Sequence, residues 1–165
     1  MNHNSFDWIN HLDLSPHPEG GYFKEIYRNK TEISGKNLPG NYSGNRNLAT
    51  SIYFLLDKDQ VSKLHRLASD EIWYFHAGSS VIVHVFYNGN YTLHTLGDNH
   101  RNNEQLQVIL PAGSIFGAEV ADKNSFGLFG CMVAPGFHFD DFDLIQGDNL
   151  INLYPMQNDL ILRLT

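Results

Sequence analysis

A predicted chain reversal at residues 88 and 89 is the strongest constraint on the fold. Asn88-Gly89 separates two apolar segments rich in β-branched and aromatic residues, 81–87 and 91–96. Asn and Gly both tolerate the positive φ angles that a two-residue hairpin turn requires. The sequence therefore predicts an antiparallel β-hairpin at this point, and with it an antiparallel sheet.

Similar short segments recur along the chain and are bounded by turn residues. Further strands are expected at 22–28, 49–56, just before residue 65, 71–75, 106–110, 127–134 and 160–165. Short helices are expected only at 5–14 and 148–153, and the stretch 29–48 is expected to be a long exposed loop or flap. About ten short strands with closely spaced turn signals predict an all-β sandwich or barrel.

Length and composition narrow the class of protein. A chain of 165 residues fits a single domain, 1–165, with a core of its own. Eighteen acidic against eleven basic residues argue against a nucleic-acid-binding face. Cys131 is the only cysteine, and no apolar run is long enough to span a membrane. We therefore expect a cytoplasmic protein with no internal disulfide and no membrane segment.

The stretch from residue 65 to residue 78 concentrates chemically active side chains. Two imidazoles, two carboxylates and several aromatic rings precede Gly78. Side chains alternate between the two faces of a strand, so Trp73 and Phe75 are expected to face inward together with Glu71. The same alternation turns His76 outward. The sequence predicts that this stretch forms the floor of a pocket.

The order of these elements resembles the two-motif layout of the cupin superfamily. His65 and Glu71 match the first histidine and the glutamate of the first cupin motif, and Pro111 and Gly113 match the second motif. Three longer stretches resemble an uncharacterised branch sometimes called cupin family five; they are 16–23, 65–73 and 130–137. The resemblance implies a single jelly-roll barrel of about ten or more strands with short peripheral helices.

The resemblance also bears on metal binding. The usual cupin site combines three imidazoles and one carboxylate, but Leu67 and Phe116 stand where two of the histidines belong. His65 and Glu71 are therefore only weak metal candidates. We expect no stably bound metal and no cofactor.

More distantly, the chain resembles the metal-free nucleotide-sugar 3,5-epimerases. That resemblance implies His65 as a base, supported by Glu71 or Asp70. The required acid would be Tyr74 or Tyr53, because residues 114–133, where the epimerase tyrosine would fall, contain no tyrosine.

The predicted ligand is small and polar, such as a sugar or a nucleotide. The candidate ligand-binding residues are Arg66, Trp73, Phe116, Tyr53, Glu19 and Arg28. A metal-independent sugar or sugar-nucleotide epimerase or isomerase is one hypothesis, and a binding module without turnover is another. A metal-dependent cupin enzyme is disfavoured by Leu67 and Phe116, so the sequence leaves open whether the chain is an enzyme. Its surplus of apolar strands leads us to expect a homodimer.

Overall fold

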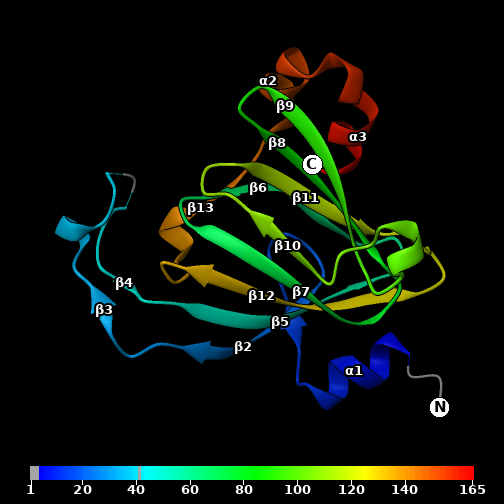
Figure 1. Ribbon diagram of the computed structural model, residues 1–165, viewed down its shortest axis with the longest axis horizontal. Coiled ribbons are helices and arrows are strands. Elements are labelled where there is room, and N and C mark those ends of the chain that lie inside the picture. Colours follow the sequence, from blue (N-terminus) through cyan, green and yellow to red (C-terminus); the bar gives the residue numbers. More distant parts are fainter. Residues whose placement is uncertain (1–3, 41) are drawn as a thin grey trace.

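Two antiparallel β-sheets packed face to face form the body of the computed structural model, which describes residues 4–40 and 42–165 (Figure 1). The six-stranded sheet has the order β1 (Ser15–Pro16), β2 (Tyr22–Arg28), β5 (Thr50–Asp57), β12 (Phe126–Ala134), β7 (Asp70–Gly78), β10 (Gln107–Leu110). The five-stranded sheet has the order β13 (Phe142–Leu144), β6 (Val61–Leu67), β11 (Ile115–Val120), β8 (Val81–Tyr87), β9 (Asn90–Leu96). The all-β prediction is confirmed. Within the described residues the sheets form a jelly-roll sandwich that is not closed into a barrel.

The core lies between the two sheets because alternate side chains of every strand point inward. Val81, Val83 and Val85 of β8 are buried there, opposite Trp73 and Phe129 of the other sheet. The indole of Trp73 stacks on Phe129 with 4.5 Å between ring centroids. The predicted β7 alternation therefore places Trp73 inside, while His76 is exposed as expected.

The predicted hairpin is confirmed. Strands β8 and β9 pair from Val81 opposite Leu96 to Tyr87 opposite Asn90. Asn88 and Gly89 have φ angles of 50° and 77°, the conformation that favours these two residues in a tight turn.

The helices are peripheral. Helix α1 (Ser5–His11) begins with a capping box between Asn4 and Asp7, and it lies against the outer face of the six-stranded sheet (Figure 1). Helices α2 (Gly147–Leu153) and α3 (Asn158–Arg163) cover the outer face of the other sheet, with the 3-10 turn η4 (Pro155–Gln157) between them.

One predicted strand is wrong, because residues 160–165 belong mainly to helix α3. Ile161 and Leu164 are fully buried against Leu64 and Phe86, whereas Leu162 is 60% exposed. Burial at spacing three is helical, while a strand would have buried Leu162 together with Leu164. The alternating leucines of this segment concealed its helical periodicity.

Other segments refine the expected loops. The stretch 29–48 carries a two-stranded ladder of β3 (Glu32–Ile33) and β4 (Arg46–Asn47), joined through η1 (Gly35–Asn37), although residue 41 lies outside the described part of the chain. Further 3-10 turns are η2 (His100–Asn102) and η3 (Phe139–Asp141).

Strand β11 (Ile115–Val120) was not predicted, because its buried Glu119 and small residues at 117 and 118 obscure the apolar pattern. Among the described residues no helix has the length and apolarity to cross a membrane.

Replacing Gly78, which ends β7, should destabilise the sandwich more than replacing the hairpin glycine. Gly78 has φ +91°, and an added Cβ would lie 2.1 Å from the Phe126 carbonyl oxygen, whereas a Cβ at Gly89 would meet nothing within 4 Å. We expect Gly78→Ala to lower the free energy of unfolding by about 3 kcal/mol and Gly89→Ala by about 1 kcal/mol. Urea unfolding measures both losses, and equal losses would contradict the close-approach argument.

Candidate functional site

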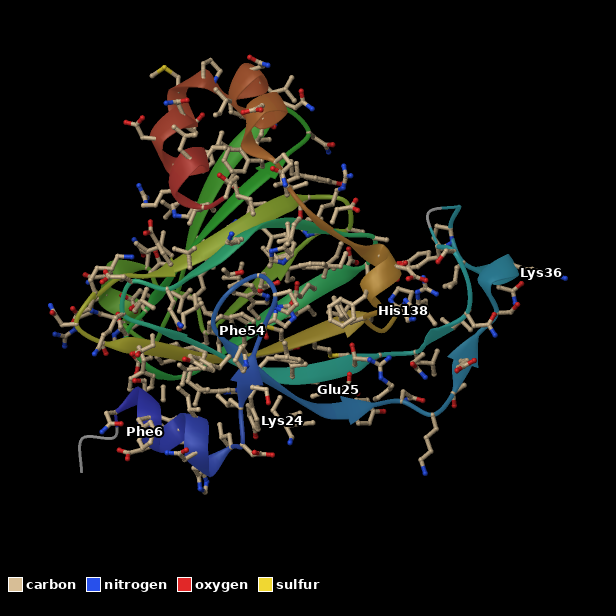
Figure 2. All side chains as sticks on the ribbon, turned by 180° about the vertical axis from the view of Figure 1, so that it is seen from behind. Phe6, Lys24, Glu25, Lys36, Phe54 and His138 are labelled. Carbon is tan, nitrogen blue, oxygen red and sulfur yellow. The ribbon has the colours of Figure 1, made fainter. Side chains whose placement is uncertain are left out.

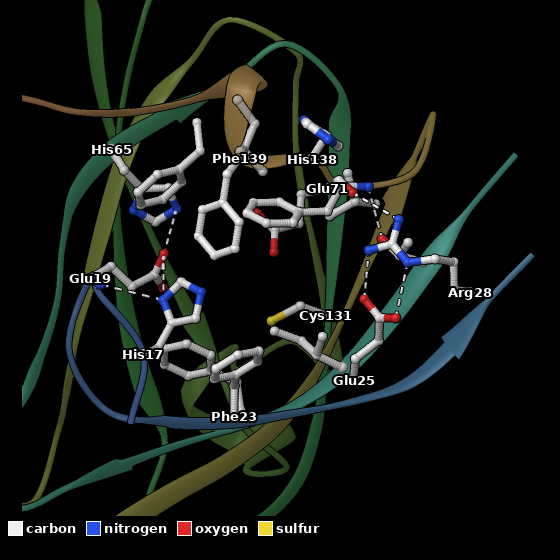
Figure 3. A pocket seen from close by; sticks show the side chains of 17 residues that line it. His17, Glu19, Phe23, Glu25, Arg28, His65, Glu71, Cys131, His138 and Phe139 are labelled. Carbon is white, nitrogen blue, oxygen red and sulfur yellow. Dashed lines mark hydrogen bonds and ion pairs between the residues drawn. The ribbon is translucent and has the colours of Figure 1, made fainter. Parts of the chain in front are cut away.

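A cavity of about 220 Å3 opens between the two sheets (Figure 3). Its walls come from β2, β5, β6, β7 and β12 and from segments 17–19 and 137–142. Its aromatic lining residues are Phe23, Phe54, Phe137, Phe139 and Phe142. Its ionisable lining residues are His17, Glu19, Glu25, Arg28, His65, Glu71, Cys131 and His138. The cavity is thus a largely apolar pocket with a few convergent polar groups, as small-molecule sites commonly are.

Strand alternation places the floor of the cavity. His65 and Leu67 are two residues apart on β6, so both side chains face inward. Glu71 of β7 pairs with Val133 of β12, and both line the cavity. The floor is therefore built from neighbouring positions on regular strands, which fix the directions of the side chains.

Glu19 reaches the cavity from the Pro-Gly loop between β1 and β2. Gly20 has φ +106°, and its missing Cβ allows the Val61 carbonyl oxygen to approach. The Lys63 N–H donates to the Glu19 carbonyl oxygen at 2.8 Å. These contacts hold the loop against β6 and bury the Glu19 side chain, of which 7% remains exposed.

Glu19 lies between two imidazoles (Figure 3). Its Oε2 is 3.4 Å from Nε2 of His65 and 3.5 Å from Nδ1 of His17, and its Oε1 accepts a hydrogen bond of 2.8 Å from the Ser62 hydroxyl. The separations from the two imidazoles exceed those of strong hydrogen bonds. A small shift is therefore enough to form a hydrogen bond between Glu19 and either imidazole, and a ligand could bond to Glu19 or to an imidazole instead.

Burial decides which protons these groups carry. It raises the pKa of Glu19 to about 8, against the opposing effect of the Ser62 hydrogen bond. Burial also lowers the pKa of His17 to about 4, with a further contribution from His65. The pKa of His65 is lowered by burial as well, although Glu71 and the Lys63 carbonyl oppose the shift. At neutral pH Glu19 is therefore protonated and both imidazoles are neutral.

The hydrogen bond at Nδ1 fixes the tautomer of His65. Nδ1 lies 2.7 Å from the Lys63 carbonyl oxygen, which can only accept. The neutral ring therefore carries its proton on Nδ1, and the lone pair of Nε2 faces Glu19.

Glu71 is a buried carboxyl group with an unused oxygen. Its side chain is buried, and its Oε2 has no hydrogen-bond partner among the described residues. Burial raises the pKa of Glu71 to about 7, against the opposing effect of His65 and with a further rise from Glu19. A carboxyl group that titrates near neutral pH inside a cavity is a candidate for acid–base chemistry.

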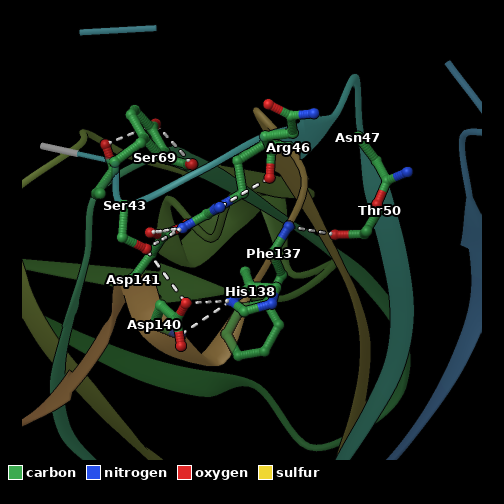
Figure 4. Close-up of polar contacts among 12 residues, drawn as sticks. Ser43, Arg46, Asn47, Thr50, Ser69, Phe137, His138, Asp140 and Asp141 are labelled. Atoms are coloured by element: carbon green, nitrogen blue, oxygen red, sulfur yellow. Dashed lines mark hydrogen bonds and ion pairs between the residues drawn. The ribbon is translucent and has the colours of Figure 1, made fainter. Parts of the chain in front are cut away.

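An aromatic lid closes one side of the cavity. Phe137, Phe139 and Phe142 contact one another with ring centroids 5.1 to 6.2 Å apart. The guanidinium of Arg46 holds this segment through two hydrogen bonds to the carboxylate of Asp141, of 2.5 and 2.6 Å (Figure 4). Only 4% and 3% of these two side chains are exposed, so the pair fastens the arm of β3 and β4 to the lid.

The rim carries an ion pair. Arg28 donates two hydrogen bonds to the Glu25 carboxylate, and its remaining bonds go to Asn47 and the Phe137 carbonyl oxygen. Figure 2 shows Glu25 and His138 on the side from which the arm extends, whereas Phe54 lies within the sandwich. Arg28 therefore ties the lid to β2 and already has partners for its charge.

Four of the predicted site residues meet at the cavity. His65 and Glu71 line its floor, Glu19 lies beside His65, and Arg28 lies at the rim. Phe116 is buried behind His65, with ring centroids 4.3 Å apart, and does not line the cavity.

Other predicted site residues lie elsewhere. Tyr74 and Tyr53 alternate with inward-facing neighbours and therefore point to the outer face of the six-stranded sheet. Asp70 is exposed and accepts the Ala112 N–H, and Arg66 is exposed beside Asp143. The structure therefore does not bring the expected acids, Tyr74 and Tyr53, to the cavity, and Asp70 and Arg66 do not line it either. Trp73 belongs to the core and offers no stacking surface.

Sequence reasoning missed several lining residues. His17 lies in the Pro-Gly loop next to Glu19, and the centroid of its ring is 4.7 Å from that of Phe23. The sequence shows the alternating phenylalanines and aspartates of the lid, but it does not show where the lid lies. The position of the lid over the cavity depends on the Arg46–Asp141 pair, whose residues are 95 positions apart.

The residues present do not fit the usual cupin metal. Leu67 lines the cavity where one ligand histidine would stand. Phe116 stands in place of another and packs against His65 outside the cavity lining. Within the described ranges no group of three or more His, Cys, Asp or Glu side chains is arranged to hold a metal ion.

Comparison with known proteins identifies relatives of the whole sandwich. An uncharacterized protein of Saccharomyces cerevisiae is 30% identical over 150 residues, which cover 86% of this chain and 75% of the yeast protein. The solved structure of a hypothetical protein from Leishmania major superposes with a TM-score of 0.89 at 32% identity, covering 99% of both chains. A structure of a protein from Shewanella oneidensis superposes with a TM-score of 0.87 at 38% identity, covering 99% of this chain and 98% of the other.

A more distant likeness is informative about the fold alone. Oxalate decarboxylase from Bacillus subtilis is 15% identical, with a TM-score of 0.55 over 93% of this chain and 37% of the decarboxylase.

The family model described as Cupin superfamily (DUF985) matches residues 6–145. With most of its length matched by that model, the chain belongs to this family of the cupin superfamily.

Proposed function

We propose that the chain binds a small organic molecule in the cavity between its sheets and moves a proton on it without a metal, as an isomerase does. The observation that carries this proposal is the pair of buried carboxyl groups, Glu71 and Glu19, facing one cavity with pKa values of about 7 and about 8. Two titratable groups held at different pKa values supply an acid and a base at the same pH.

Glu71 is the better matched base. A base works best when its pKa lies near the working pH, and that of Glu71 is about 7. His65, the base expected from the epimerase resemblance, is less suited because burial lowers its pKa and weakens its basicity. In this proposal the unpartnered Oε2 of Glu71 takes a proton from a ligand carbon that lies beside an electron-withdrawing group.

Glu19 supplies the proton that the ligand receives. Glu19 is the group that stays protonated at neutral pH. Its Oε2 is 3.4 Å from Nε2 of His65, the ring nitrogen that carries no proton. A buried carboxylic acid replaces the tyrosine expected as the acid. Glu19 gives its own proton to the ligand while Glu71 keeps the proton that it took, and exchange with solvent after release restores both groups. His65, beside Glu19, orients the acid.

Binding without turnover is the second candidate, and the lining favours it. Five phenylalanine rings surround the cavity, and the carboxyl groups are few. A sugar nucleotide is not favoured, because Arg28 is the only guanidinium among the described lining residues and it is already paired with the Glu25 carboxylate.

A generic carbon acid tests the proton transfer before the ligand is known. The chain should accelerate ring opening of 5-nitrobenzisoxazole, a compact aromatic that loses one proton to a base and becomes a coloured nitrophenolate. We expect Glu71→Gln to lower the rate roughly 100-fold, the usual contribution of a positioned base. The rate should rise with pH and level off above about 7, following ionisation of Glu71.

Glu32→Gln on the exposed arm is the matched control and should keep the wild-type rate. Equal rates for wild type and Glu71→Gln across the pH range would exclude Glu71 as the base. Circular dichroism of each variant confirms that the sandwich has folded.

Stability should fall between pH 6.5 and 8. The folded chain keeps the proton of Glu19 up to a pKa of about 8, whereas the unfolded chain loses it near the ordinary value of 4.5. The unfolded state therefore binds fewer protons in this range, and the free energy of unfolding falls as pH rises, by about 2 kcal/mol. The lowered pKa values of His17 and His65 act mainly below pH 6.5, where they reduce stability as pH falls.

Urea unfolding at a series of pH values measures this slope. Glu19→Gln, which can still accept the Ser62 hydrogen bond, should flatten it, whereas Glu71→Gln should retain the part above pH 7. A wild-type stability that rises from pH 6.5 to 8 would contradict the assignment.

A further inference from the structure

The charges around the cavity also select the class of ligand. We propose that the cavity binds a small organic cation, an ammonium group on a compact apolar body, with Glu71 as its counter-ion and the phenylalanines of the lid as its walls. This inference rests on the proposed function in one respect, that the cavity is the ligand site.

Among the described lining residues, no guanidinium or ammonium group is free of an ion-pair partner that an anion would have to displace. The lining holds three carboxyl groups, those of Glu19, Glu25 and Glu71, against one guanidinium. That guanidinium, Arg28, is occupied by Glu25, Asn47 and the Phe137 carbonyl oxygen. A phosphate or carboxylate entering the cavity would meet carboxyl groups and aromatic rings without a cation to offset its lost hydration.

Glu71 has an acceptor oxygen that no cationic group of the protein engages. Its Oε2 is buried and receives no well-formed hydrogen bond from the described residues, and the donors beside the carboxyl group, the Trp73 indole and the Cys131 thiol, are neutral. An ammonium group donates hydrogen bonds and carries the opposite charge, so it satisfies this oxygen more fully than a neutral hydroxyl can.

The other groups that face Glu71 do not supply that charge. His65 is neutral because burial lowers its pKa, and burial raises the pKa of the Cys131 thiol well above its ordinary value, so that it stays protonated. Glu19 is an acid, and the Trp73 indole is a neutral donor. His17 is neutral, and at the rim His138 lies against the carboxylate of Asp140, with 3.3 Å between Nδ1 and Oδ2. The ligand is therefore the remaining source of positive charge beside Glu71.

The aromatic walls suit a cation. The face of an aromatic ring is electronegative and attracts an ammonium group, more strongly where water is excluded. Phe137, Phe139 and Phe142 contact one another around the opening, and Phe23 and Phe54 lie beside His17 on the opposite side. The combination of phenylalanine rings and a buried carboxylate is the chemistry by which proteins hold alkylammonium ions.

Binding of a cation has a second consequence, the release of a proton. Glu71 has a pKa of about 7 and is half protonated at pH 7, and a neighbouring ammonium group favours its ionised form. The bound cation thus leaves Glu71 as a carboxylate, the state in which it acts as a base. About half a proton should be released per ligand at pH 7.

Titration calorimetry with three matched probes tests the inference. Benzylamine, benzyl alcohol and benzoate share a phenyl ring and differ in charge, and all are compact enough for a cavity of about 220 Å3. At pH 7 we expect benzylamine to bind roughly tenfold or more tightly than benzyl alcohol, and benzoate more weakly than either. Titrations in two buffers of different ionisation enthalpy should show the proton released with benzylamine only.

Two variants separate the contributions of charge and ring. Glu71→Gln should reduce the preference for benzylamine over benzyl alcohol to about one and abolish proton release. Phe139 is 57% exposed, so Phe139→Leu should fold normally while it weakens benzylamine roughly threefold more than benzyl alcohol. Glu32→Gln should behave as wild type.

Each contrary result has a distinct meaning. Tighter binding of benzoate, or equal binding of amine and alcohol in wild type and Glu71→Gln, would overturn the cationic ligand while leaving the cavity as the binding site. Failure of all three probes to bind would overturn the inference, and the nitrobenzisoxazole assay would then decide separately whether Glu71 still transfers protons.

Discussion

The burial of two carboxyl groups beside two neutral imidazoles is the constraint on which the rest of the structure depends. Glu19 and Glu71 are almost fully enclosed, and no guanidinium or ammonium group in the described residues forms an ion pair with either. Their close partners are imidazoles, a hydroxyl, an indole and a thiol. Groups in such a place stay protonated, or share protons, because the charged forms lose their hydration. The cavity is thus nearly uncharged inside at neutral pH and can change its charge when a ligand enters.

The fold maintains this arrangement through contacts that lie outside the cavity. Gly20 allows the Pro-Gly loop to lie against β6, which brings Glu19 to His65. The Arg46–Asp141 pair fastens the lid to the arm of β3 and β4, and the bond from Arg28 to the Phe137 carbonyl oxygen fastens it to β2. The strong ion pairs of this region lie at the lid and the rim. The carboxyl groups and imidazoles of the interior are therefore not locked in ion pairs, and their protonation can change.

The sequence predicted more of the fold than of the site. The Asn88-Gly89 turn and the cupin-like spacing around His65 predicted the hairpin, the sheets and the position of the pocket floor. Alternation along β7 also separated Glu71 and Trp73 from His76, but it could not tell that Trp73 is packed on Phe129 and closed off from the cavity. Tyr74 lies away from the cavity, because closeness to Glu71 in the sequence does not determine which face of the strand Tyr74 occupies. Glu19 was expected only as a pocket residue, because its approach to His65 joins segments far apart in the chain. Its altered pKa follows from burial, which no local pattern reveals.

The central claim is that Glu71 and Glu19 hold their protons to near neutral pH, and carbon-13 NMR of the glutamate side-chain carboxyls tests it most directly. Spectra recorded from pH 3 to pH 9, with Glu71→Gln and Glu19→Gln to identify the two signals, give each pKa without reference to any ligand. The account predicts one carboxyl titrating at about 7 and another at about 8. Titration of both signals at the ordinary glutamate value near 4.5 would contradict it.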